Sequence, residues 1–216
     1  MVLSRSGSDP TDPLAGLPAA DRALLESILA AVVDAVAVCR SVRQRLARDR
    51  ALAADKADRS PVTVADYAVQ ALLCRALERA APADPIMAEE SAAELRAAPA
   101  LARAVQSELE RVGVTAPATA VHAWLDRGAL GEFRDRFWAI DPIDGTKGFV
   151  GGRQYAIAIA RLDLGVPTLG VLACPELRTE PGRCGVIQVG RPGQFAIEAD
   201  LAADCRVDAL RWRALR

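Results

Sequence analysis

Apolar residues recur at helical spacing through the first quarter of the chain. Between Asp21 and Arg48 they stand mostly three or four positions apart, and they are Leu25, Ile28, Leu29, Val32, Val36, Cys39, Val42 and Leu46. This spacing places them along one face of a helix. The pattern therefore predicts a long amphipathic helix over residues 21–48.

A polar loop follows, and a second apolar pattern begins after Pro61-Val62-Thr63. It predicts a helix from Val64 to Ala80, which Pro82 would end because proline cannot continue a helix. Thr63 and Asp66 also fit a helix start, in which a cap residue is followed three positions later by an acid. On this interpretation the role of Asp66 is structural.

Short apolar runs bounded by turn residues are typical of strands. The first, residues 85–88, precedes Glu89-Glu90, and an Ala-rich region with helical stretches extends over residues 92–131. Further strands are expected at residues 137–140, 155–162, 168–174, 185–189 and 194–198. Because helices come first and strands later, we expect an α+β domain with layered helices and strands. A surface helix is the simplest expectation for residues 210–216.

Composition limits the classes of protein and partner. The 216 residues are 51% hydrophobic and 25% charged, which is typical of a globular domain. A net charge of −1 and an aromatic content of 4% argue against nucleic acid or an anionic membrane as partner. The single histidine, His122, argues against a His-based zinc site. Five cysteines without a CxxC pair favour a reducing, cytoplasmic compartment.

Candidate chemistry is concentrated in residues 141–146, which directly follow an apolar stretch. Asp141 and Asp144 are three positions apart, so their side chains converge only if the backbone turns, and Pro142 favours a turn. The carbonyl of Ile143 can then face the same point. Ligands that are all oxygen suit Mg²⁺ or Mn²⁺ rather than zinc.

Other residues could complete such a site. Glu89 follows a predicted strand and could reach the same cation; the alternative is that Glu89 and Glu90 form a solvated acidic pair. Gly145 and Thr146 stand where a helical turn would begin, and exposed amides there bind phosphate, although an ordinary Asp-Gly turn is also possible. Asp66, instead of capping a helix, could orient or deprotonate an attacking water through the Thr146 hydroxyl.

Three segments occur in a characteristic order along the chain. They are DRSPVTVADY at residues 58–67, AEES at residues 88–91 and WAIDPIDGTKGF at residues 138–149. Together they resemble the inositol monophosphatase superfamily of Mg²⁺-dependent, lithium-sensitive phosphatases. Ser-Pro-Val-Thr before the helix and Lys-Gly-Phe after Asp-Gly-Thr are most similar to its 3′(2′),5′-bisphosphate nucleotidase branch. The resemblance extends over about residues 21–200.

The resemblance implies a set of roles. Four groups are implied Mg²⁺ ligands, which are Glu89, Asp141, the Ile143 carbonyl and Asp144. By the same resemblance, Asp66 and Thr146 would activate the attacking water. Gly145 and Thr146 would bind the scissile phosphate. The implied substrate is a small phosphorylated nucleotide, adenosine 3′,5′-bisphosphate or its sulfated parent. The products would be AMP, or adenylyl sulfate, and phosphate.

The resemblance weakens towards the C-terminus. Members of the family carry another metal-binding aspartate in a Trp-Asp-x-Ala segment, which this sequence lacks. We therefore expect a disordered lead-in over residues 1–20 and an N-terminal α+β phosphatase domain over residues 21–200. The C-terminal α/β part would be missing, and residues 201–216 would form a divergent tail. Two alternatives remain: a phosphatase of inositol phosphates, and a catalytically incompetent fragment that binds a partner through an unfinished sheet edge.

Overall fold

The computed structural model describes residues 14, 17–52, 61–131, 134–180, 183–202 and 206–215. The helices are α1 (Ala19–Leu52), α2 (Pro61–Ala80), α3 (Ala92–Ala97), α4 (Pro99–Arg111), α5 (Ala118–Asp126), α6 (Thr146–Val150) and a 3₁₀ turn, η1 (Val207–Ala209). The strands are β1 (Ile86–Ala88), β2 (Arg136–Asp144), β3 (Ala156–Asp163), β4 (Val166–Glu180), β5 (Arg183–Arg191), β6 (Phe195–Asp200) and β7 (Arg213–Ala214). Within these ranges, no helix is long and apolar enough to cross a membrane.

The two long helices bury their apolar faces in one shared core. Of the eight positions that define the pattern in α1, seven are buried and Leu46 is partly buried against the core. The helix extends beyond the predicted residues 21–48 at both ends, because alanine and arginine, which favour helix, flank the apolar pattern. The strands form the other side of this core. Buried and exposed residues alternate along them, and the buried ones pack against the helices.

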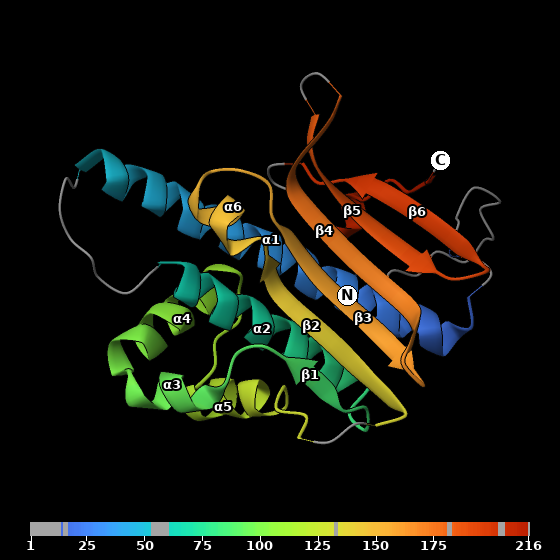
Figure 1. The fold of residues 1–216 in the computed structure, drawn as a ribbon, viewed down its shortest axis with the longest axis horizontal. Coiled ribbons are helices and arrows are strands. Elements are labelled where there is room, and N and C mark those ends of the chain that lie inside the picture. Colours follow the sequence, from blue (N-terminus) through green and yellow to red (C-terminus); the bar gives the residue numbers. More distant parts are fainter. Residues whose placement is uncertain are drawn as a thin grey trace.

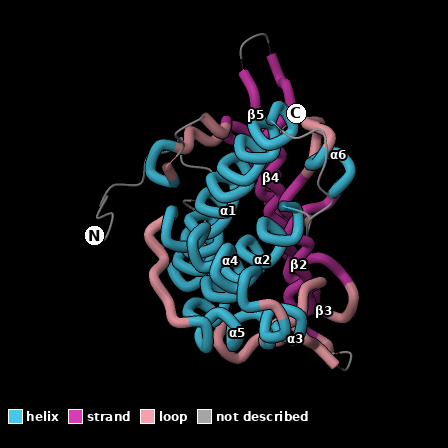
Figure 2. Tube along the Cα trace, turned by 90° about the vertical axis from the view of Figure 1, so that its left-hand side faces the viewer, coloured by secondary structure: helices cyan, strands magenta, loops and turns pink. Residues whose placement is uncertain are grey.

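In the described part of the chain, seven strands form one sheet in the order of the sequence, β1 to β7. Strands β1 and β2 pair in parallel, and all later neighbours pair antiparallel. Helix α1 crosses behind the strands in Figure 1, and the side view in Figure 2 shows α1, α2, α4 and α5 on one side of the sheet. The α+β, layered fold class predicted from the sequence is confirmed, and the predicted strands occur with somewhat different bounds.

Helix α2 begins earlier than the sequence pattern indicated. It starts at Pro61, so Thr63 lies in the first turn and is not the cap residue. Proline suits the first helical position because the amide there needs no partner within the helix. The interpretation of Asp66 as the acid that completes a cap at Thr63 is therefore wrong.

The end of the chain also differs from expectation. Residues 210–215 form no surface helix; β7 pairs antiparallel with β6, with Ala214 opposite Ile197. The Arg213 guanidinium lies 2.9 Å from carboxylate oxygens of both Glu198 and Asp200, and these ion pairs favour the strand over a helix. Leu210 is buried in the core. Most of the predicted lead-in, residues 1–20, lies outside the described residues.

Candidate active site

The end of β2 contains the predicted break in the strand. Asp141 pairs with Ala158 of β3 and Asp144 pairs with Ala156, so the register shifts between the two acids. One extra residue on β2 means that the two carboxylates are no longer constrained to opposite faces of the sheet. Asp144 is exposed, whereas the side chain of Ile143 is buried.

A tight turn joins β2 to α6. Gly145 has φ 87°, a conformation that favours glycine, and its carbonyl accepts hydrogen bonds from the amides of Gly148 (2.7 Å) and Phe149 (3.0 Å). The Thr146 hydroxyl donates to the Ile143 carbonyl at 3.3 Å. A Cβ atom at Gly148 would lie 1.9 Å from the Gln154 carbonyl oxygen, so only glycine fits there. The turn expected at residues 145 and 146 is therefore present and closely packed.

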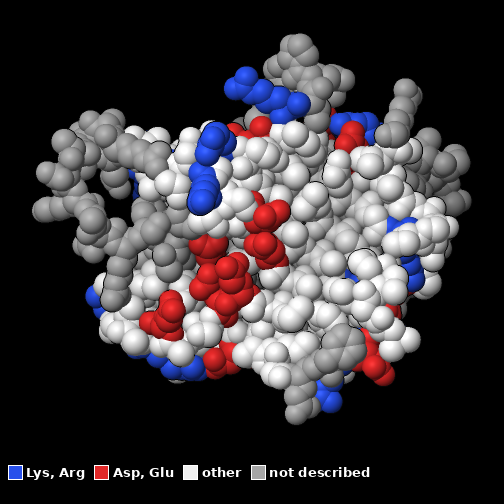
Figure 3. Space-filling view, in the orientation of Figure 1, with Lys and Arg blue, Asp and Glu red and all other residues white. Residues whose placement is uncertain are grey.

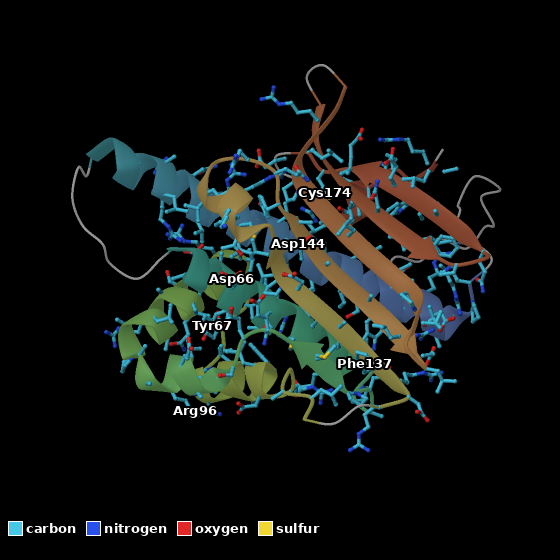
Figure 4. All side chains as sticks on the ribbon, viewed as in Figure 1. Asp66, Tyr67, Arg96, Phe137, Asp144 and Cys174 are labelled. Atoms are coloured by element: carbon cyan, nitrogen blue, oxygen red, sulfur yellow. The ribbon has the colours of Figure 1, made fainter. Side chains whose placement is uncertain are left out.

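Asp66 approaches this turn from α2. Its side chain is only 7% exposed. Burial raises the pKa of Asp66 to about 8, and the negative charges of Glu90, Glu89 and Asp141 add to this effect. Figure 4 shows Asp66 and Asp144 on neighbouring elements, α2 and the end of β2. The structure thus brings Asp66 into the electrostatic field of the acids predicted to bind a metal.

Asp141 and Glu90 are perturbed in the same direction. Burial raises the pKa of Asp141, and Asp144 and Glu89 raise it further, while a hydrogen bond from the Ile143 amide opposes them. Burial also raises the pKa of Glu90. Glu89 itself is exposed, whereas Glu90 is half-buried, so the two do not form a uniformly solvated pair. Acidic side chains gather in one area of the surface in Figure 3.

The donor set fits a hard divalent cation in its chemistry. Every candidate donor is an oxygen, and the Oδ1 atom of Asp141 is buried without a hydrogen-bond partner. As they stand, however, no three Asp, Glu, His or Cys side chains in the described part of the chain form a group that could hold a metal ion. Coordination would therefore require the carboxylates to rotate towards one another.

Sequence reasoning missed Gln70, which stands beside the acids. Gln70 lies one helical turn after Asp66 and its side chain hydrogen-bonds to the backbone of Glu90. A polar residue on the buried face of a predicted helix was the available signal. Its partner, 20 positions away along the chain, could not be identified from the sequence pattern.

A hollow of about 700 Å³ extends from the acids across the outer face of the sheet. Its lining is mainly small and apolar, with residues such as Ala139, Ala160 and Gly170, and Glu89 and Asp141 stand among the lining residues. The acids therefore border an apolar surface rather than a polar channel.

Comparison with known proteins agrees with the motif pattern. The model of the "Inositol monophosphatase family" matches residues 24–184. "3′(2′),5′-bisphosphate nucleotidase 1" of Candida albicans (strain WO-1) is 39% identical over 134 residues, which are 56% of this chain and 37% of that protein. "3′(2′),5′-bisphosphate nucleotidase" of Oryza sativa is 38% identical over 177 residues, 76% of this chain and 48% of that protein.

Among solved structures, "Mycobacterium tuberculosis SuhB" aligns with a TM-score of 0.48 and 21% identity, over 91% of this chain and 51% of that chain. The chain spans less than half the length of the curated relatives it matches. The family model nevertheless covers most of α1, all of α2 to α6, the acids and the turn before α6. This chain therefore belongs to the inositol monophosphatase family.

Proposed function

We propose that this chain carries the metal- and phosphate-binding residues of a Mg²⁺-dependent phosphomonoesterase. The reaction is removal of the 3′-phosphate from adenosine 3′,5′-bisphosphate or its sulfated parent, which yields AMP or adenylyl sulfate and phosphate. One observation carries the proposal: burial raises the pKa of Asp66 and of Asp141 beside the turn at Gly145, and the negative charge of Glu89 raises both pKa values further. Carboxylates that repel one another in this way are well suited to a shared cation.

We assign the proposed roles from the resemblance of the motifs to the family. Glu89, Asp141, the Ile143 carbonyl and Asp144 would hold Mg²⁺. When bound, Mg²⁺ lowers the pKa of water and neutralises charge on a transferring phosphoryl group.

The chain's own residues would do the rest of the chemistry. Asp66, whose raised pKa of about 8 leaves it protonated at neutral pH without a cation, would ionise as the cation binds. The Thr146 hydroxyl, which donates to the Ile143 carbonyl in this structure, would turn to donate to the Asp66 carboxylate, and Asp66 would accept the proton of the attacking water through it. The backbone amides at Gly145 and Thr146 would hold the phosphate oxygens.

The substrate class is supported by the relatives. Those from Candida albicans and Oryza sativa are both named as 3′(2′),5′-bisphosphate nucleotidases. The matching region contains the acids and the Lys147-Gly148-Phe149 segment of this chain. A phosphatase of inositol phosphates is the alternative within the family.

Phosphate release tests the proposal. The full chain, folded by circular dichroism, should release phosphate from adenosine 3′,5′-bisphosphate with Mg²⁺, lose this activity in EDTA, and be inhibited by lithium. Faster release from inositol 1-phosphate would overturn the substrate assignment alone. Absence of release from either substrate would overturn the enzymatic proposal for this chain and favour the non-catalytic alternative.

Asp66→Asn separates a role in proton transfer from a role in stability. We expect turnover to fall by about 100-fold or more, because Asn cannot accept the proton. Stability at pH 7 without a cation should rise rather than fall, because Asp66 must bind a proton to be neutral in the folded state, whereas Asn is neutral at every pH. Urea unfolding and phosphate release, measured on the same preparation, check both parts. Glu110→Gln, on an exposed position of α4, is the matched control.

A further inference from the structure

Gln70 is one of the three polar or charged residues that are buried in the described part of the chain; the others are Asp66 and Glu108. Its exposed fraction is 0%. Gln70 and Asp66 are four positions apart in α2, so they share one face of the helix. A buried amide on this face must find partners for both its oxygen and its nitrogen, because an unsatisfied polar group is costly.

Both partners of the Gln70 amide belong to a single residue, Glu90. Gln70 Nε2 donates to the Glu90 carbonyl at 2.6 Å, and Gln70 Oε1 accepts from the Glu90 amide at 2.7 Å. Strand β1 ends at Ala88, so none of the described strands is a neighbour that could bond the backbone of Glu90. The Gln70 side chain satisfies the amide and the carbonyl of Glu90 instead. The side chain thereby clamps the backbone just after β1 to helix α2.

Glu89 lies between two fixed points as a result. On one side, Ala88 is paired with Ile140 of β2, and its amide donates to the Gly128 carbonyl at 2.9 Å. On the other side, Glu90 is held by Gln70. The position of Glu89 relative to Asp66 therefore depends on α2, since the clamp and Asp66 belong to the same helix.

The space around the Gln70 amide depends on a glycine. A Cβ atom at Gly128 would lie 2.9 Å from the Cβ of Ala88 and 3.0 Å from Gln70 Nε2. Both contacts are shorter than, or at the limit of, normal packing, so a larger residue would press on the clamp and on β1 together. The absence of a side chain at Gly128 therefore leaves the space that the Gln70 amide occupies.

We propose that Gln70 is a positioning residue that sets the placement of Glu89 relative to Asp66 and so determines the affinity for the divalent cation. The inference rests on the proposed function of the acids. Gln70 touches neither substrate nor cation, and its effect would come from preorganisation of a ligand held on a rigid helix. Loss of the clamp should weaken cation binding while leaving the chemical step intact once the cation is saturating.

The test compares Gln70→Met, Gln70→Glu and wild type in the full chain. Methionine keeps the length of the side chain without hydrogen bonds, and glutamate keeps an acceptor for the Glu90 amide. Mg²⁺ binding is measured by calorimetry on the protein without substrate. We expect the dissociation constant to rise about tenfold or more in Gln70→Met and less in Gln70→Glu. Hydrogen exchange at the Glu90 amide should accelerate in Gln70→Met even without Mg²⁺.

Gln106→Met is the matched control, because Gln106 also donates to a backbone carbonyl, that of Ala116 at 3.1 Å, but on α4. It should leave Mg²⁺ binding unchanged. If Gln70→Met binds Mg²⁺ within twofold of wild type, the inference is overturned and the proposed function stands. If folded wild type binds no Mg²⁺, the inference about Gln70 and the proposed function are both overturned. If Gln70→Met does not fold, Gln70→Glu decides by the same twofold criterion.

Discussion

At the scale of single residues, the environment of each carboxylate decides its charge. Asp34 of α1 shows this away from the candidate active site. Burial raises the pKa of Asp34 to about 6, and the positive charge of Arg75 on α2 only partly offsets this. The Arg75 guanidinium also lies over the Trp124 ring of α5, 5.6 Å from its centre, and this contact holds the guanidinium in place.

Asp34 should make the stability depend on pH. Its pKa is higher in the folded protein than the value of 3.8 expected when unfolded, so the folded state binds the proton more tightly. Its contribution to stability is present below about pH 4 and is lost as the pH rises to about 6. Asp34→Asn should therefore be more stable than wild type at pH 7, with the advantage disappearing towards pH 4.

Urea unfolding at pH 4, 5, 6 and 7 measures this difference. Glu26→Gln removes an exposed carboxylate from the same helix and serves as control. An advantage of Asp34→Asn that is constant across this range would contradict the assignment.

At the scale of secondary-structure elements, α6 is held in place by a residue of α1. The Arg43 guanidinium lies 5.9 Å from the ring centre of Phe149 and 5.4 Å from that of Tyr155, and the two rings meet edge to face at 4.9 Å. Arg43 Nη1 also lies 2.8 Å from Glu176 Oε1 of β4. One side chain thus joins the long helix, the turn that follows β2 and the middle of the sheet.

Arg43→Met should loosen this junction. We expect a loss of about 1–3 kcal/mol in the free energy of unfolding, because a cation–π contact and a partly buried ion pair are both removed. The free energy of unfolding of Arg43→Lys should lie between those of wild type and Arg43→Met, because lysine keeps the charge but not the planar contact with the rings. Urea unfolding measures the loss, and hydrogen exchange at the Phe149 amide reports on α6 itself.

Arg22→Met is the control for Arg43→Met, because the pair of Arg22 with Glu26 is exposed and worth about 0.3–0.5 kcal/mol. Equal losses in Arg43→Met and Arg22→Met would contradict a role for Arg43 in holding α6.

The elements and the acids differ in how far the sequence determines them. Periodicity predicted α1 and most strands because burial on one face leaves a local pattern, and the break at Pro142 was predicted from backbone chemistry. β7 was not predicted, because two residues carry no pattern and their pairing depends on Arg213 meeting acids of β6. The clamp from Gln70 to Glu90 was missed for the same reason: its two halves are brought together only by the fold.

At the scale of the whole molecule, the two faces of the sheet are unlike. In the described ranges, α1, α2, α4 and α5 lie on one side, and Figure 2 shows no helix of comparable length on the other. The outer face carries the apolar hollow, and Met87 at its margin is 46% exposed. Figure 3 shows a broad area there without charged side chains. An exposed apolar surface of this kind favours association.

Charging the outer face should therefore change association without unfolding the protein. Ala160→Lys places a cation in the hollow, and we expect weaker self-association in sedimentation velocity. Leu164→Lys is the control, since Leu164 is 74% exposed in the turn between β3 and β4, outside the hollow. A large loss of stability in Ala160→Lys would show that this face is covered in solution.

The parallel pairing of β1 with β2 has a consequence for the order of folding. Strands β3 to β6 follow one another through short turns, so hairpin closure can pair them early. Strand β1 can join β2 only after the segment between Ala88 and Arg136, which contains α3, α4 and α5, has folded back. Glu89 follows β1 and Asp141 belongs to β2, so the acidic cluster depends on the slowest contact. Recovery of Mg²⁺ affinity during refolding should then lag behind formation of the antiparallel sheet.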